Sequence, residues 1–213
     1  MSFFSRGETR LSLRLKKLQQ LQQGTEVIWD IGCDHGLLGT SFLTQPEIKK
    51  IHLVDPSEEV INKLRDTYIT NEQISIHHGF GQSIELDKNT KTIYIAGMGG
   101  KEIKEIILNL IPQLSETDQL IISPHRKILE LRKFLENSPL RCAHEEVIEE
   151  ANQYYQILSL TLKKNYPEVS PFGDGLWESV TGTSYRRHQI QSFSLHKDVA
   201  SVEYVRYLRG LTG

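Results

Sequence analysis

The polar residues most suited to chemistry lie in a glycine-containing turn, Asp30-Ile-Gly-Cys-Asp-His-Gly-Leu-Leu-Gly39. Gly32 and Gly36 let the backbone turn sharply and let a ligand approach closely. The dinucleotide fingerprint G-x-G-x-x-G is not met, because the glycines stand at positions 32, 36 and 39. A carboxylate at Asp30 would repel a pyrophosphate, whereas it suits an ammonium group such as that of a methionine moiety. Taken alone, the segment also fits a plain strand-to-helix turn.

Two further segments fit an adenosine. Asp55 ends the next predicted strand, 23 positions after Gly32, and a carboxylate there can bind both ribose hydroxyls. The alternative is an acid that caps the helix beginning near Ser57. Phe80, in a Gly-Phe-Gly-Gln turn after the third predicted strand, would stack on an adenine or else be a core residue of a hairpin-like turn.

The segment Ile95-Ala-Gly-Met-Gly-Gly100 follows the fourth predicted strand. A tight turn explains one glycine, but three within four positions indicate a closely approaching ligand. Met98 is flexible and polarizable and would line the pocket. After the fifth predicted strand, His125 would contact a substrate base or phosphate; the alternative is an exposed histidine where a helix starts.

Other kinds of site are not supported. The histidines and the two cysteines, Cys33 and Cys142, show no zinc-ligand spacing, so we expect no metal. Neither a G-x-S-x-G nucleophile motif nor a G-x-x-x-x-G-K-[ST] phosphate loop occurs. Because the chain has only two cysteines, we expect no disulfide framework, and a reducing cytoplasm is the expected location.

The composition sets the class of protein. The chain has 213 residues, of which 38% are hydrophobic and 24% charged, which excludes a disordered chain because enough apolar surface exists to offset chain entropy. No run approaches the ~20 apolar residues of a membrane span, and residues 1–10 lack a signal-peptide core, so we expect no membrane partner. A net charge of -2 does not by itself indicate a nucleic-acid binder.

Strands and helices alternate along the first two thirds of the chain. Predicted strands cover residues 27–32, 50–55, 73–78, 91–97 and 118–123, and predicted helices cover residues 36–44, 57–68, 101–111 and 126–137. This alternation predicts an α/β fold with a parallel sheet and right-handed crossovers. Ligands of such sheets bind at the carboxyl ends of the strands, where the segments above would meet.

The end of the chain departs from this alternation. Residues 142–150 and 154–164 both look extended, and their link is too short for a parallel crossover, so they predict an antiparallel hairpin at the sheet edge. A sheet of this kind suits a Rossmann-like methyltransferase better than a nucleotide dehydrogenase, by analogy of topology. We expect a main domain over residues 1–165 and a small helical region over residues 166–213, helical from 184 to 211.

A basic helix is predicted near the N-terminus, over residues 6–23 of the main domain. Its cations Arg6, Arg10, Arg14 and Lys17 are spaced for one helical face. That face would hold RNA phosphates, which orients an RNA without specifying its sequence. The alternative is a solvated helix face.

Together these features resemble the bacterial TrmK family of S-adenosylmethionine-dependent methyltransferases. The segments that carry the likeness are LSLRLKKL (11–18), DIGCDHGLL (30–38), IAGMGG (95–100), LIISP (120–124), LRKFLENS (131–138) and EEVIEEANQYYQILSL (145–160). The pairing of IAGMGG with Asp-His after the glycine turn is the most specific part. Two departures stand out: Phe80 replaces an acid expected near the adenine amino group, and Ser123-Pro124-His125 replaces Gln-Pro-Asn.

The resemblance implies a class I methyltransferase fold, S-adenosyl-L-methionine as cofactor, and methyl transfer to N1 of an adenine in the D-arm of tRNA. With the residue arguments above it gives these cofactor-binding candidates: Asp30, Gly32, Asp34, Gly36, Asp55, Pro56, Gly79, Phe80, Gly81, Gln82, Ala96, Gly97, Met98 and Gly99. Asp34 would stabilise the positive charge that develops on the base, and His35 or His125 would position that base.

Other readings stay open on the sequence alone. In one alternative the chain is a methyltransferase that acts on another RNA or on a small molecule. In another it is a non-catalytic adenosine- or RNA-binding relative, and the missing acid at Phe80 favours this second alternative. A nucleotide dehydrogenase fits less well. We expect tRNA as partner and a monomer or weak dimer.

Overall fold

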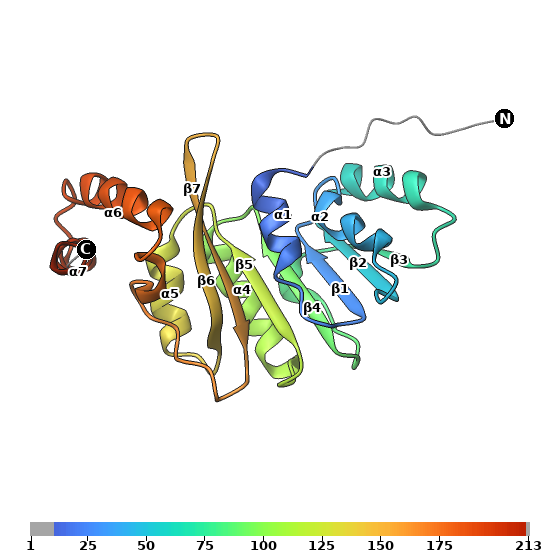
Figure 1. The fold of residues 1–213 in the computed structure, drawn as a ribbon. Coiled ribbons are helices and arrows are strands. Elements are labelled where there is room, and N and C mark those ends of the chain that lie inside the picture. Colours follow the sequence, from blue (N-terminus) through green and yellow to red (C-terminus); the bar gives the residue numbers. More distant parts are fainter. Residues whose placement is uncertain (1–10, 212–213) are drawn as a thin grey trace.

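A computed structural model describes residues 11–211 of the chain (Figure 1). Its strands are β1 (Val27–Ile31), β2 (Lys50–Asp55), β3 (Ile74–His78), β4 (Lys91–Ala96), β5 (Gln119–Ser123), β6 (Arg141–Glu150) and β7 (Gln153–Thr161). They form one seven-stranded sheet in the order β3-β2-β1-β4-β5-β7-β6. The sheet is parallel from β3 through β5, whereas β7 runs antiparallel to both β5 and β6. The predicted Rossmann-like sheet with a C-terminal hairpin is confirmed.

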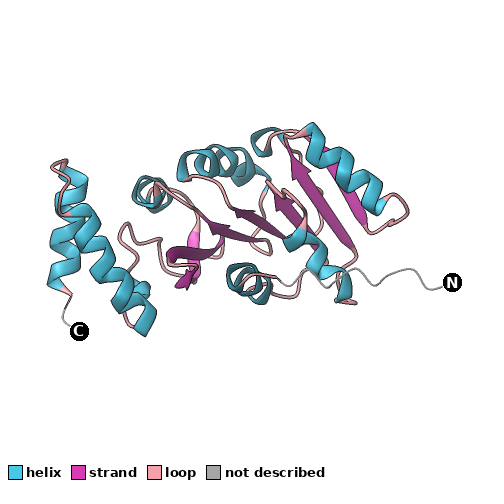
Figure 2. Ribbon diagram, turned by 90° about the horizontal axis from the view of Figure 1, so that it is seen from above, coloured by secondary structure: helices cyan, strands magenta, loops and turns pink. Residues whose placement is uncertain are grey.

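Helices cover both faces of this sheet (Figure 2). The α-helices are α1 (Leu13–Gln20), α2 (Leu37–Thr40), α3 (Glu58–Tyr68), α4 (Gly100–Leu110), α5 (Ile128–Glu136), α6 (Val180–Phe193) and α7 (Val199–Gly210). Apolar side chains of α1, α2 and α3 pack on one face, and those of α4 and α5 pack on the other. Because β1 is covered on both faces, its five residues are all buried.

The first helix is shorter than predicted. Within the described residues α1 begins at Leu13, because the Ser12 side chain accepts a hydrogen bond from the Leu15 amide and caps it. It ends at Gln20 rather than at residue 23. Residues 6–10 of the predicted helix, which include Arg6 and Arg10, lie outside the described residues.

The helical stretch predicted over residues 184–211 is two helices that pack together beside the hairpin, at the end of the sheet away from β3 (Figure 1). The Asp198 side chain accepts a hydrogen bond from the Ser201 amide and starts α7. Tyr185 of α6 and Tyr204 of α7 share a buried apolar cluster with Val147 of β6. No helix among residues 11–211 is long and apolar enough to cross a membrane.

A buried arginine connects α5, the hairpin and the chain that leads to α6. The Arg132 side chain is 0% exposed, and its guanidinium donates to Gln156 Oε1, to Glu145 Oε2 and to the Ser170 carbonyl, at 2.7, 2.7 and 2.9 Å. The other Glu145 oxygen accepts the Gly175 amide at 2.7 Å. Each of the three guanidinium nitrogens therefore donates a hydrogen bond. These bonds offset the free-energy cost of taking the charge out of water.

Replacing Glu145 by Gln is expected to destabilise the protein by about 3 kcal/mol, because it leaves the Arg132 charge buried without its counterion. Chemical denaturation checks this. The matched control is Glu59→Gln, which removes the same charge from an exposed pair with Lys63 and should leave the unfolding midpoint nearly unchanged. Equal effects of the two substitutions would contradict a special role for the buried pair.

Candidate active site

A cavity of about 240 Å³ lies at the carboxyl ends of β1 and β4. Eight residues that the sequence predicted as site residues line this cavity. They are Asp30, Gly32, Asp34, His35, Ala96, Gly97, His125 and, from the predicted basic face, Arg14. Leu15, Cys33, Leu37 and Leu38 complete the lining. The parallel register brings these segments together, since β1 is hydrogen-bonded between β2 and β4.

Asp30 supplies a buried carboxyl group to this cavity. It is 4% exposed, and Oδ2 accepts a hydrogen bond from the Gly39 amide at 2.8 Å. Burial raises the pKa of Asp30 to about 7, the Gly39 hydrogen bond opposes this rise, and the Asp55 carboxylate adds to it. Among the described residues no cation pairs with Asp30. A carboxyl group with these properties in a cavity suits a cationic ligand.

Gly32 and Met98 are partners in packing. Gly32 has φ +72°, and a Cβ added there would collide with the Met98 methyl group. Met98 packs over this glycine and against the core below α4. It is not among the residues that line the cavity, so its contact with a cofactor stays a prediction.

The three glycines of residues 97–100 have different roles. Gly97 has φ +82°, and the nearest atom to a Cβ placed there would be His125 Nε2, at 3.9 Å, so bare backbone faces the cavity. A Cβ on Gly99 would meet Glu102 and Arg126, and one on Gly100 would lie 2.5 Å from the Lys127 carbonyl. Only Gly97 therefore fits the predicted approach of a ligand, while Gly99 and Gly100 allow close packing between α4 and the loop before α5.

Asp55 holds the loops around the site. Its Oδ2 accepts the Asp34 amide at 3.0 Å and its Oδ1 accepts the Ser57 amide at 2.9 Å. The Ser57 hydroxyl, rather than Asp55, caps α3. Each carboxylate oxygen keeps a further acceptor position, so these contacts are compatible with the predicted binding of ribose hydroxyls.

The segment after β3 forms an open surface beside the cavity rather than part of its wall. Phe80 is 60% exposed, so the alternative of a core phenylalanine is wrong. A Cβ on Gly81 would meet Ile31 and Ile106 at 2.5 and 2.8 Å, so this predicted cofactor residue faces the core. In the same segment Gln82 is exposed, and the Gly79 amide donates to the Asp55 carbonyl at 3.0 Å.

Two further predicted cofactor residues lie in other loops. Pro56, after β2, is exposed. Gly36, after β1, is buried with φ +68° and packs near Leu53 and Leu64.

Asp34 and His35 are exposed at the mouth of the cavity. Asp34 has φ +48°, an uncommon conformation for a residue with a Cβ, and such strain is concentrated at functional sites. His35 Nε2 lies 3.8 Å from Asp34 Oδ1. The two side chains are therefore free to contact a molecule that enters from solvent.

His125 is held by an arginine that sequence reasoning placed elsewhere. Arg14 Nη1 lies 2.9 Å from His125 Nε2, and because a guanidinium only donates, Nε2 accepts and the ring proton belongs on Nδ1. Burial lowers the pKa of His125, and the Arg14 and Arg126 charges lower it further. The Arg14 guanidinium also lies 4.9 Å from the centre of the Tyr155 ring.

The basic face of the first helix is thus not a free phosphate-binding stripe where it is described. Arg14 turns toward the cavity, and Lys17 Nζ lies 3.6 Å from Glu146 Oε2. The helical spacing predicted that these cations share a face. It could not predict that this face contacts the loop after β5 and the hairpin, because those segments are distant in the sequence.

The cavity does not resemble a nucleophile or metal site. Burial raises the pKa of the Cys33 thiol well above its usual range, and the Asp30 and Asp55 carboxylates raise it further, so the reactive thiolate is disfavoured. In the part of the chain that the structure describes, no three His, Cys, Asp or Glu side chains gather as metal ligands.

A family model described as a methyltransferase domain matches residues 11–158. The chain belongs to this family of methyltransferase domains. The match begins just before α1 and ends in β7, so it spans all the segments that build the cavity, and α6 and α7 lie beyond it.

Curated relatives of this methyltransferase domain include RNA-modifying enzymes. A Mycoplasma genitalium protein named as a candidate tRNA methyltransferase is 28% identical over 145 residues, which are 66% of this chain and 65% of that protein. The tRNA (adenine(22)-N(1))-methyltransferase of Bacillus subtilis is 25% identical over 154 residues, 71% of this chain and 65% of that enzyme. The chain thus matches slightly less than two thirds of the length of these two relatives.

Solved structures share the fold over nearly the whole chain. The B. subtilis m1A22 tRNA methyltransferase TrmK has a TM-score of 0.70 at 19% identity, with 95% of each chain covered. The Mycoplasma capricolum TrmK, solved with S-adenosyl-homocysteine, has a TM-score of 0.75 at 20% identity, covering 93% of this chain and 96% of that one. At these identities the likeness shows the fold, and it includes the region of α6 and α7.

The contact between Arg14 and His125 has a measurable consequence in the methyltransferase domain. Replacing Arg14 by Ala removes a nearby positive charge and part of the cover over the ring, so the pKa of His125 is expected to rise. An NMR titration of the histidine ring protons measures this pKa. The control is Lys17→Ala on the same helix, which should leave it unchanged; an unchanged value in the Arg14 variant would contradict the contact.

Proposed function

We propose that this chain is an S-adenosylmethionine-dependent methyltransferase that transfers a methyl group to N1 of an adenine in tRNA. The observation that carries the proposal is the cavity at the carboxyl ends of β1 and β4, where the buried Asp30 carboxyl, the bare backbone of Gly97 and the His125 ring meet. The methyltransferase family and the named tRNA-modifying relatives support the same reaction.

The residues present fit this cofactor. Asp30 is buried and has no cationic partner among the described residues, so it would bind the ammonium group of the methionine moiety. Asp55 keeps acceptor positions for ribose hydroxyls, and the exposed ring of Phe80 would stack on the adenine. When bound, the cofactor supplies an activated methyl group on a sulfonium.

Catalysis by this site would rest on positioning and charge. Adenine N1 has a free lone pair at neutral pH, so orientation is the main requirement, and it can contribute about 7–11 kcal/mol to barrier lowering. N1 lies on the Watson–Crick edge, so the base must be unpaired or flipped out. His125, neutral with its proton on Nδ1, offers the purine a hydrogen-bond donor without repelling the cationic product. The Asp34 carboxylate would stabilise the positive charge that moves onto the base.

Replacing Asp30 by Asn separates cofactor binding from stability. The variant should bind S-adenosylmethionine at least about tenfold more weakly, since an ion pair with the ammonium is lost. It should unfold at a higher temperature at neutral pH, because a carboxyl whose pKa is raised to about 7 destabilises the folded state once it ionises. Calorimetry and thermal unfolding measure both effects.

The pH dependence gives the matched comparison. Below about pH 7 wild-type Asp30 takes up a proton, so cofactor affinity should fall as the pH drops while the cofactor-free protein gains stability from this group. In the Asn variant the contribution from residue 30 should be absent. Parallel pH profiles for the two proteins would contradict the role of Asp30.

The reaction is tested with labelled S-adenosylmethionine and unmodified tRNA, followed by nucleoside analysis. The expected product is 1-methyladenosine, and a tRNA carrying guanine at position 22, the site named for the B. subtilis relative, should take up no label. Label in another nucleoside would redirect the proposal to another RNA site. Cofactor binding without transfer to any RNA would overturn it.

A further inference from the structure

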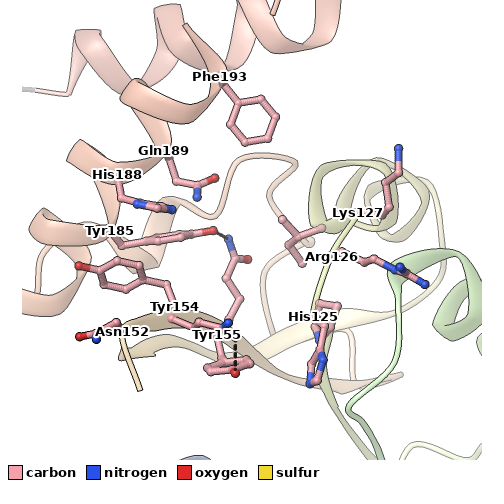
Figure 3. Close-up of a pocket in the computed structure, with 14 residues that line it drawn as sticks. His125, Arg126, Lys127, Asn152, Tyr154, Tyr155, Tyr185, His188, Gln189 and Phe193 are labelled. Carbon is pink, nitrogen blue, oxygen red and sulfur yellow. Dashed lines mark hydrogen bonds between the residues drawn. The ribbon is translucent and has the colours of Figure 1, made fainter. Parts of the chain in front are cut away.

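A second cavity adjoins the candidate active site and has no role in the proposed reaction. Its volume is about 420 Å³, within the range of about 300–1,000 Å³ typical of ligand pockets. It lies between the loop after β5, the start of β7 and α6 (Figure 3). His125 lines both this cavity and the active-site cavity, so a polymer that enters one can reach the other.

A buried side-chain oxygen at this cavity has no donor among the residues that the structure describes. It is Oε1 of Gln189, a residue of α6 that is 8% exposed. Leaving a buried polar group unsatisfied costs about 1–3 kcal/mol. By contrast the neighbouring Gln156 is satisfied on both sides, accepting from Arg132 at 2.7 Å and donating to the Tyr185 hydroxyl at 2.9 Å. The unsatisfied Oε1 of Gln189 is an acceptor, so it points to a ligand that carries a hydrogen-bond donor, such as the edge of a nucleobase.

Aromatic rings make up much of the remaining wall. The centre of the Tyr154 ring lies 5.3 Å from that of Tyr185 and 5.3 Å from that of His188. Figure 3 shows these rings and Gln189 on the side of α6, with His125, Arg126 and Lys127 across from them. Flat π faces beside an amide are suited to a nucleobase, which can stack on the former and hydrogen-bond to the latter.

The charges at the cavity fit an anion. No Asp or Glu is among its lining residues, which include Arg126 and Lys127. Lys127 Nζ pairs with Glu130 at 2.8 Å, whereas for Arg126 residues 11–211 contain no ion-pair partner. One wall therefore presents a guanidinium without an ion pair among the described residues, although the Glu102 carboxylate lies near it at Gly99; such a group is suited to a phosphate.

From these contacts we infer that the second cavity binds an unpaired nucleotide of the RNA substrate, next to the base that enters the active site; this rests on the proposed function. The base stacks against Tyr154 and hydrogen-bonds to Gln189, and Arg126 contacts a phosphate. His125 and Tyr155, whose rings lie 5.5 Å apart, separate this nucleotide from the target base.

The site is held by the same buried network that joins α6 to the sheet. Arg132 fixes Gln156, and Gln156 fixes the Tyr185 hydroxyl. The wall that faces the base is therefore positioned before RNA binds, which lowers the entropic cost of binding. It also gives the C-terminal helices, which lie beyond the family match, a direct part in substrate recognition.

The test is the affinity of the full chain for unmodified tRNA, measured by fluorescence anisotropy at fixed salt, in the Gln189→Leu and Tyr154→Leu variants. Losing either contact should raise Kd about fivefold or more, the lower end of what one stacked base contributes. Tyr154→Phe is the matched control, because it keeps the ring and should restore affinity. Thermal unfolding and S-adenosylmethionine binding are measured on the same proteins.

A ligand-binding role and a packing role give opposite results for Gln189. Its Oε1 has no hydrogen-bond partner among residues 11–211, so Gln189→Leu should unfold at the same or a higher temperature while losing affinity for tRNA. Unchanged tRNA affinity in both leucine variants would overturn the inference, as would a loss of affinity that follows a lower unfolding temperature or lost cofactor binding.

The two proposals fail in different ways. If wild-type protein methylates tRNA and the variants bind it normally, the nucleotide site is wrong and the reaction stands. If the variants bind tRNA weakly but wild-type protein transfers no methyl group to it, the site stands and the reaction is wrong. If wild-type protein does not bind tRNA, both are overturned.

Discussion

The parallel hydrogen bonding of β1 between β2 and β4 is the constraint on which the rest of the molecule depends. It places the end of β1 in the middle of the sheet, where helices on both faces exclude water. Asp30 thus ends in a buried position, with the Gly39 amide as its hydrogen-bond donor, and the loops after β1, β4 and β5, together with α1, surround it. The cavity is the space that remains between those loops.

Two pairs of buried polar residues in this protein behave differently. Arg132 and Gln156 have partners for their buried polar atoms, and they join α5, the hairpin and α6 into one body. Asp30 lacks a cation and Gln189 Oε1 lacks a donor among the described residues. Arg132 and Gln156 stabilise the fold through their contacts, whereas Asp30 and Gln189 each line a cavity, where a ligand can supply the missing partner.

Segments far apart in the sequence meet at His125. Arg14 reaches it from α1, Gly97 faces it from the loop after β4, and Tyr155 packs against it from the hairpin. The histidine is kept neutral by these surroundings, since burial and two guanidiniums all disfavour a second proton. In the proposed reaction the base leaves with a positive charge, which such a neutral neighbour would not repel.

The sequence by itself determined the succession of strands and helices along the chain, the hairpin, and which segments lie around the cavity. These follow from local signals: apolar runs, glycines at turns and a link too short for a crossover. The tertiary structure alone decided which residues face the cavity and which face the core. Met98 packs over Gly32, Gly81 faces the core, and Arg14 turns inward to His125. That Gln189 Oε1 has no partner among residues 11–211 also follows from the packing of α6 against the hairpin. Such directions depend on contacts between residues distant in the chain, which spacing along one helix or turn does not record.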